Sequence, residues 1–124
     1  MLDSLKQYLG QQGIENIFLD VMPPVEKQLE AVGLFEWDNT VPEINDGSGV
    51  HYIQVQVRRS TYDSAKAQCR KIFDLLDSGT DERVLHLSDE IFCIGRPRRG
   101  ALLLERGEGY STFYCEIALW CNCN

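Results

Sequence analysis

The pattern of hydrophobic and polar positions changes its period in the middle of the chain. Hydrophobic and polar residues alternate over 50–58, which predicts a half-buried strand because successive side chains of a strand point to opposite faces. The alternating residues are Ile53, Val55 and Val57 on one face and Gln54, Gln56 and Arg58 on the other. A helical spacing follows and predicts a helix over about 62–76, with Ser60 as its N-cap and Gly79 as its stop signal. The helical set is Ala65, Cys69, Ile72, Phe73 and Leu76.

Most of the remaining chain predicts short strands. The predicted strands are 14–21, 29–37, 84–87, 90–94, 101–104 and 112–121. Residues 84–94 form one interrupted strand or two short ones, and 25–32 has a helical turn as its alternative. A short amphipathic helix at the amino terminus is marked by Leu2, Leu5, Tyr8 and Leu9. The predicted loops are 38–49, 78–83 and the basic segment 96–100, and 105–109 is the turn of a closing hairpin.

The last predicted strand indicates how the sheet is covered. Hydrophobic residues at every second position alternate with residues of mixed polarity, so that one face of the strand belongs to the core. The core set is Phe113, Cys115, Ile117, Leu119 and Cys121. Strands in series, with one helix at the amino terminus and one in the middle, predict an α+β fold rather than a regular βαβ alternation. We expect a single domain over 1–124, with a mainly antiparallel sheet and both helices packed on one face.

The charge balance narrows the classes of partner. Nineteen acidic and twelve basic residues give a net charge of −7, which repels a phosphate backbone at long range. We therefore expect no sequence-specific nucleic-acid binding. The sequence has no apolar run of the ~18 residues that a membrane span needs and no signal-peptide pattern, which predicts a cytosolic product without a membrane contact.

The five cysteines favour free thiols over a disulfide framework. Their number is odd and they are widely spread, whereas short secreted chains usually have an even number of cysteines. Cys69, Cys93 and Cys115 lie in hydrophobic segments and are expected to be small buried residues. Zinc is not expected at Cys115, Cys121 and Cys123, because structural zinc takes four ligands that usually come from paired Cys-x₂₋₄-Cys turns.

The sequence offers little that would serve an enzyme. Its two histidines, His51 and His86, have no cysteine or carboxylate at a ligand spacing, and catalysis needs a base and a group that orients it. The glycines form no phosphate-binding motif. The acidic pairs Asp81-Glu82 and Asp89-Glu90 lie beside predicted turns, where solvated charge is the ordinary interpretation. We expect no catalytic residue, no cofactor and no metal.

Basic residues cluster at 96–99 on this acidic chain, with a further arginine pair elsewhere at 58–59. The candidate interface for a partner or for another subunit consists of Arg58, Arg59, Arg96, Arg98 and Arg99. Such a cluster suits an acidic protein surface, including that of a second copy of the chain. A nucleic-acid site would interleave aromatic residues with the arginines and carry an overall positive charge. A solvated loop without a partner is the alternative interpretation.

The order of these features resembles the small minor capsid or tail-terminator (tail-completion) proteins of phages and prophages with long, non-contractile tails. The resemblance covers nearly the whole chain. It consists of the helix that ends before Gly13, the strand before Pro23-Pro24, Leu34-Phe35-Glu36-Trp37, Val41-Pro42, Val55-Gln56-Val57-Arg58, the helix with Tyr62, Ala65 and Ile72-Phe73-xx-Leu76, Pro97, and the aromatic Phe113-Tyr114. The carboxyl-terminal cysteines depart from the family pattern.

The resemblance implies a structural role in virion assembly. Members of the family are small α+β subunits that form an oligomeric ring at the head-proximal end of the tail, stop growth of the tail tube and join tail to head. The implied partners are further copies of the chain, tail-tube proteins and head-connector proteins. The implied location is the head–tail junction of the virion, with the host cytoplasm during assembly. A head-completion or connector protein and a non-viral cytosolic protein-binding module are the alternatives.

Overall fold

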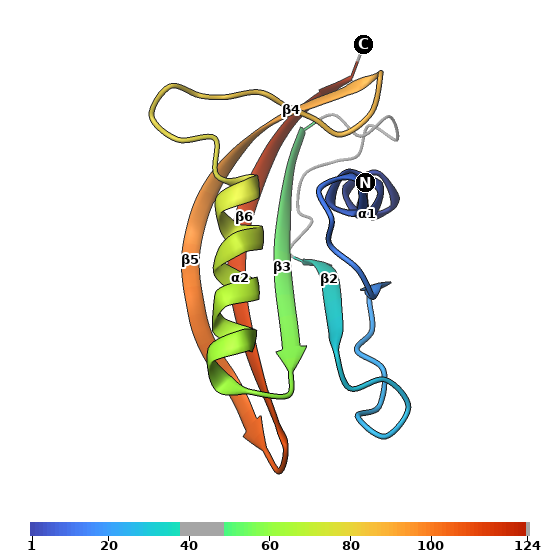
Figure 1. Ribbon diagram of the computed structural model, residues 1–124. Helices are drawn as coiled ribbons and strands as arrows, with labels where there is room; N and C mark the ends of the chain where they lie inside the picture. Colours follow the sequence, from blue (N-terminus) through green and yellow to red (C-terminus); the bar gives the residue numbers. More distant parts are fainter. Residues whose placement is uncertain (38–48, 124) are drawn as a thin grey trace.

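The computed structural model describes residues 1–37 and 49–123, and it confirms the predicted single-domain α+β fold. The described residues form a six-stranded sheet in the order β1-β2-β3-β6-β5-β4, in which β1 and β2 are parallel and the other neighbours antiparallel (Figure 1). The helices are α1 (Leu2–Gln11) and α2 (Tyr62–Leu76). The strands are β1 (Ile17–Leu19), β2 (Ala31–Trp37), β3 (Gly49–Arg59), β4 (Leu85–His86), β5 (Ile91–Gly107) and β6 (Tyr110–Cys123).

The hydrophobic core lies between the sheet and the two helices. The helix α2 packs on β3, β5 and β6, and α1 packs on β1 and β2 (Figure 1). The predicted helical face of α2 is buried at Ala65, Cys69, Ile72 and Leu76, with Phe73 partly buried beside it. The predicted core face of β6 is buried as well, at Phe113, Cys115, Ile117, Leu119 and Cys121. The helical period of α2 and the two-residue period of β6 therefore mark the two surfaces that pack against each other.

The ends of α2 are fixed by side chains, although the N-cap is not the predicted one. Thr61, not Ser60, caps the helix: its backbone is extended and its hydroxyl accepts the N–H of Ser64 at 3.2 Å. The helix begins at Tyr62, as predicted, and a cap lies immediately before the first helical residue, so the cap position falls on Thr61. Gly79 follows the end of the helix with a φ of +75°, where its N–H donates to Asp77.

The amino-terminal strands are shorter than predicted. The predicted strand 14–21 is reduced to Ile17–Leu19, because Asn16 and Asp20 on either side have positive φ and interrupt the extended backbone. Residues 24–28 contain a hydrogen-bonded turn from Gln28 to Pro24, and β2 begins only at Ala31. The predicted loop 38–49 lies outside the described residues apart from Gly49, where β3 begins.

The prediction of a basic loop at 96–100 is wrong. These residues belong to β5, which runs without a break from Ile91 to Gly107 and pairs with β6. The pairing register shifts at three places between Pro97 and Glu105, so that the regular alternation expected of a strand is lost in this segment. The hairpin turn lies between Gly107 and Tyr110, within the region predicted for it.

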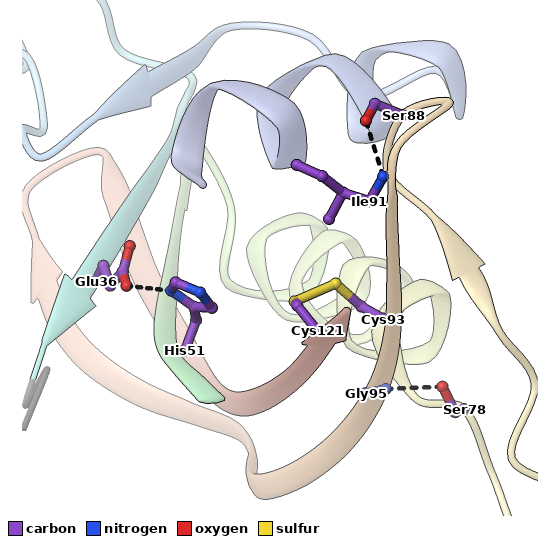
Figure 2. Close-up of a disulfide and its surroundings, with 8 residues drawn as sticks. All are labelled: Glu36, His51, Ser78, Ser88, Ile91, Cys93, Gly95 and Cys121. Atoms are coloured by element: carbon purple, nitrogen blue, oxygen red, sulfur yellow. Dashed lines mark hydrogen bonds and ion pairs between the residues drawn. A yellow bond between two sulfur atoms is a disulfide. The ribbon is translucent and has the colours of Figure 1, made fainter. Parts of the chain in front are cut away.

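The expectation that all cysteines are free thiols is also wrong. Cys93 of β5 and Cys121 of β6 are direct partners in the sheet and form a disulfide (Figure 2). Cys69 and Cys115 are free and buried, as predicted. The odd number of cysteines misled the prediction because it does not reveal which pair faces each other across two strands. Within 1–37 and 49–123, no cluster of potential metal ligands is found.

Candidate protein–protein interface

The β5–β6 hairpin has an open edge along most of its length. The short strand β4 pairs only with Cys93 and Phe92 of β5. Beyond Gly95, β5 has β6 on one side and no described strand on the other. Such an edge presents unpaired backbone N–H and C=O groups and invites pairing with another chain. Pro97 and the three register shifts interrupt this edge, which limits unspecific pairing.

Gly95 marks the point where the subunit stops covering this edge. Its N–H donates to Ser78 Oγ at 2.8 Å, and its carbonyl accepts the N–H of Ser78 at 3.1 Å. A side chain at Gly95 would collide with the carbonyl oxygen of Leu76, because a Cβ atom there would lie 1.6 Å from it. Glycine thus allows the end of α2 to close the edge here (Figure 2). The rest of β5 extends past this contact.

Three consecutive leucines are exposed on the open part of β5. Leu102, Leu103 and Leu104 are 43%, 45% and 48% exposed. Leu102 and Leu103 pair with Tyr114 and Phe113 of β6, and the Phe113 ring contacts Tyr62 at the start of α2, so the leucines lie level with the first turn of this helix. A soluble protein rarely leaves a contiguous apolar patch uncovered unless the patch serves an interaction. We call Leu102–Leu104 the leucine patch.

The predicted arginines Arg98 and Arg99 flank the leucine patch and are held against the sheet. The Arg98 guanidinium lies 4.9 Å from the ring centre of Tyr52, and Arg99 Nε lies 3.2 Å from a carboxylate oxygen of Glu116. Both side chains remain exposed. Arg96 pairs instead with Glu82 of the same subunit at 3.1 Å. The structure therefore places Arg98 and Arg99 at the surface in fixed positions, and both Arg96 and Arg99 already have an acidic partner.

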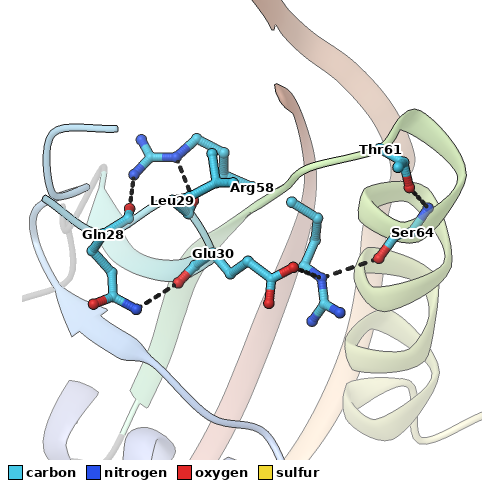
Figure 3. A network of polar contacts seen from close by, with 7 residues as sticks. Gln28, Leu29, Glu30, Arg58, Thr61 and Ser64 are labelled. Atoms are coloured by element: carbon cyan, nitrogen blue, oxygen red, sulfur yellow. Dashed lines mark hydrogen bonds and ion pairs between the residues drawn. The ribbon is translucent and has the colours of Figure 1, made fainter. Parts of the chain in front are cut away.

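Arg58 has a different role from that predicted. It is only 6% exposed, and its guanidinium donates to the backbone carbonyls of Pro23, Gln28 and Leu29 at 2.6, 2.6 and 2.9 Å (Figure 3). These hydrogen bonds tie the segment before β2 to the end of β3. Arg58 thus binds backbone carbonyls inside the subunit and is not part of the hairpin surface.

Arg59, the neighbour of Arg58, is half-exposed on the helix side. Its Nε lies 3.3 Å from a carboxylate oxygen of Glu30 and donates to Ser64 Oγ at 3.1 Å. These contacts join the residue before β2, the end of β3 and the first turn of α2 (Figure 3). Arg58 and Arg59 therefore lie apart from the other three predicted arginines, which share the hairpin.

A shallow apolar groove lies at the other end of the β5–β6 pair. It has a volume of about 530 Å³, and its lining includes Val50, Val84, Phe92, Ile94 and Trp120. Val50, Trp120 and Ile94 are neighbours across β3, β6 and β5, on the sheet face opposite the buried set of β6. Trp120 is 55% exposed, the largest exposed fraction among the large hydrophobic residues of the described chain. We call this the Trp120 groove.

One pair of a histidine and a carboxylate was not predicted from the sequence. His51 Nδ1 lies 2.6 Å from Glu36, and both side chains are mostly buried between β2 and β3 (Figure 2). His51 is in phase with Ile53, and Glu36 is in phase with Leu34, so both point to the side of the sheet that holds the core. That phase was visible in the sequence, but the register between the two strands was not. The pair joins β2 to β3 close to where the first described segment ends.

The remaining titratable groups with shifted pKa values do not form a reactive centre. A hydrogen bond with the Cys69 thiol, together with burial, raises the pKa of Cys115, which keeps this thiol protonated and unreactive. Partial burial and the nearby Glu105 carboxylate raise the pKa of Tyr110 at the hairpin turn. Neither group gains the activation that a nucleophile needs.

The chain matches none of the protein-family models and none of the curated proteins with which it was compared. None of the helices in the described parts of the chain is long and apolar enough to cross a membrane. The geometry alone therefore defines the candidate site: a projecting hairpin with an open edge, an apolar patch and exposed arginines. This composition is typical of surfaces that contact proteins.

Proposed function

We propose that the protein is a structural subunit of a phage or prophage particle, a tail terminator or minor capsid protein that forms a ring at the head-proximal end of the tail. The observation that carries this proposal is the β5–β6 hairpin, whose open edge and leucine patch have no cover within the described subunit. The order of elements that resembles this family supports the proposal.

Ring closure provides a use for both exposed features of the hairpin. When identical subunits associate head to tail, each contributes one surface to each neighbour, and the ring closes if the rotation is right. Strand edges that pair across a subunit boundary lose their unpaired backbone groups. The partners at the two faces of the ring are tail-tube and head-connector proteins.

The acidic charge fits a ring through which DNA passes. Each subunit has a net charge of −7, and a ring multiplies that charge around the channel. Repulsion keeps the channel from holding phosphates while DNA moves through it. The role is structural and requires no catalytic residue, cofactor or metal.

Polymerisation of tail tubes tests the proposed function. The tail-tube subunit of a phage with a long, non-contractile tail is assembled in the presence and in the absence of the purified protein, and tube lengths are measured by electron microscopy. We expect shorter tubes with additional density at one end. Tubes of unchanged length and without a cap would contradict a terminator, and binding to connector rings alone would favour the head-completion alternative.

A further inference from the structure

We propose that the leucine patch of one subunit docks into the Trp120 groove of the next copy of the chain. This inference rests on the proposed ring and names the surfaces that join its subunits. The leucine patch is a set of exposed apolar side chains on the β5–β6 hairpin, and the Trp120 groove is a hollow with an apolar lining. Exposed side chains can fill a hollow, so the two surfaces complement each other. The contact is therefore heterologous, the kind that builds rings.

A subunit cannot fill its own groove with its own leucines. Leu102 pairs with Tyr114, and Ile94 pairs with Trp120, so that six positions of β6 separate the two surfaces. At ~3.3 Å per residue this is a distance of about 20 Å along a continuous strand pair. The β5–β6 ladder and the contacts of Arg98 and Arg99 with the sheet keep the hairpin in place, so that the two surfaces stay apart. A contact between the leucine patch and the Trp120 groove therefore joins two different chains.

Charge favours a second copy as the occupant. The strand that carries the leucine patch has four arginines and one glutamate, on a chain whose net charge is −7. The pairs Asp81-Glu82 and Asp89-Glu90, all exposed, come shortly before Val84 and Phe92, which line the groove. A basic hairpin thus approaches an acidic rim, which steers association and sets its direction.

Within the subunit some of this charge is already neutralised. Arg96 pairs with Glu82 and Arg99 with Glu116, whereas Arg98 and Arg106 lie over tyrosine rings, so that Arg98 and Arg106 are the arginines of β5 that can pair with Asp89 and Glu90 of a neighbour. Exposed ion pairs contribute little to affinity, so the apolar contact holds the interface and the charges set its register.

Two complementary variants test this interface by native mass spectrometry of the full chain. Leu104→Asp damages the hairpin surface and leaves the groove intact, whereas Trp120→Asp damages the groove and leaves the hairpin intact. We expect each variant alone to be monomeric at a concentration at which the wild type forms its ring, with self-association weakened at least tenfold. An equimolar mixture should form a dimer of one copy of each variant and nothing larger, because only one good hairpin and one good groove remain.

Control variants separate this result from misfolding. Ala67→Asp introduces the same charge on the exposed side of α2 and should leave the ring intact. Leu102→Asp and Val84→Asp repeat the two changes at second exposed positions, in case the first variants fold poorly. Melting temperatures close to that of the wild type confirm that the subunits are folded.

The possible outcomes distinguish this interface from the proposed function. If both variants form rings of wild-type mass, the interface is elsewhere and this inference is overturned, while the ring itself stands. If folded variants are monomeric but their mixture forms no mixed dimer, the head-to-tail pairing of these two surfaces is contradicted. If the wild type is monomeric at every concentration, the ring is contradicted as well, and the interface with it.

Discussion

The β5–β6 pair has two regions of opposite character, a buried region and an exposed region. Where β5 and β6 lie under α2, their residues form the core, and Cys115, Ile117 and Leu119 are fully buried. From Arg96 on, β5 carries exposed leucines and arginines and an open edge, although its partner β6 stays in the core as far as Phe113. The length of β5 exceeds what one helix can cover (Figure 1).

This difference separates folding from assembly. Substitutions in the covered region leave a cavity or an unpaired charge in the core and lower the free energy of unfolding. Substitutions in the exposed region of β5 place the new side chain in solvent in the isolated subunit. They should therefore act on contacts between subunits. The following predictions, from the largest expected effect to the smallest, test this separation.

Ile72→Asp should unfold the subunit. Ile72 is fully buried between α2 and the sheet, and an unpaired carboxylate there should lower the free energy of unfolding by roughly 4 kcal/mol or more, a large share of the stability of a small domain. Circular dichroism during urea unfolding measures the change. Arg70→Asp, on the exposed side of the same helix, is the control and should cost less than about 1 kcal/mol. A folded Ile72→Asp variant with an unchanged melting temperature would refute the packing of α2.

Reduction of the Cys93–Cys121 disulfide should cost about 3 kcal/mol. The disulfide links residues 28 positions apart, and opening such a loop increases the entropy of the unfolded chain. Urea unfolding with and without a reductant measures the loss. The double variant Cys93→Ala/Cys121→Ala should be insensitive to reductant. Equal stability of the wild type under both conditions, with reduction verified by alkylation, would show that the disulfide does not hold the base of the hairpin.

Arg58→Met should cost about 2 kcal/mol, because it keeps the apolar stem but leaves three backbone carbonyls without their donor. Arg59→Met is the matched control at the next position. Its ion pair with Glu30 is half-exposed, so the loss should stay below about 1 kcal/mol. Thermal unfolding of the two variants compares them directly. Equal losses would mean that burial does not distinguish the two arginines.

Glu105→Gln should lower the pKa of Tyr110, the smallest of these effects. The pKa of Tyr110 is raised by partial burial and by the Glu105 carboxylate, which disfavours the phenolate. The neutral phenol therefore adds stability at pH values below its unfolded pKa of about 10, and this contribution is lost as the pH rises through the raised pKa. NMR titration of the Tyr110 ring measures the pKa. Glu108→Gln, a change at the exposed turn, should leave it unchanged, and an equal shift in both variants would contradict the assigned cause.

The sequence predicted the covered region well because periodicity records burial. The helix 62–76 and the alternation of 112–121 agree with α2 and β6, since the hydrophobic residues that define each period face the core. The same rule failed for 96–100. A strand with both faces and one edge in solvent has no hydrophobic period, and Arg96, Pro97 and Gly100 are typical of loops.

The candidate site was predicted only in part. The local charge anomaly drew attention to Arg98 and Arg99, which do lie on the exposed hairpin. It also included Arg58, because sequence does not tell a surface arginine from one that binds backbone carbonyls inside the fold. The Trp120 groove was not predicted, since it forms from residues of β3, β5 and β6 and of the segment before β4 that meet only through sheet register.

The mass of the assembled protein tests the central claim most directly. Native mass spectrometry of the purified wild-type chain is recorded over a range of concentrations, together with its exact subunit mass. A head-to-tail ring predicts one closed oligomer of fixed copy number that persists on dilution and does not grow at higher concentration. A monomer at every concentration, or a series of open-ended oligomers that lengthens with concentration, would contradict the ring.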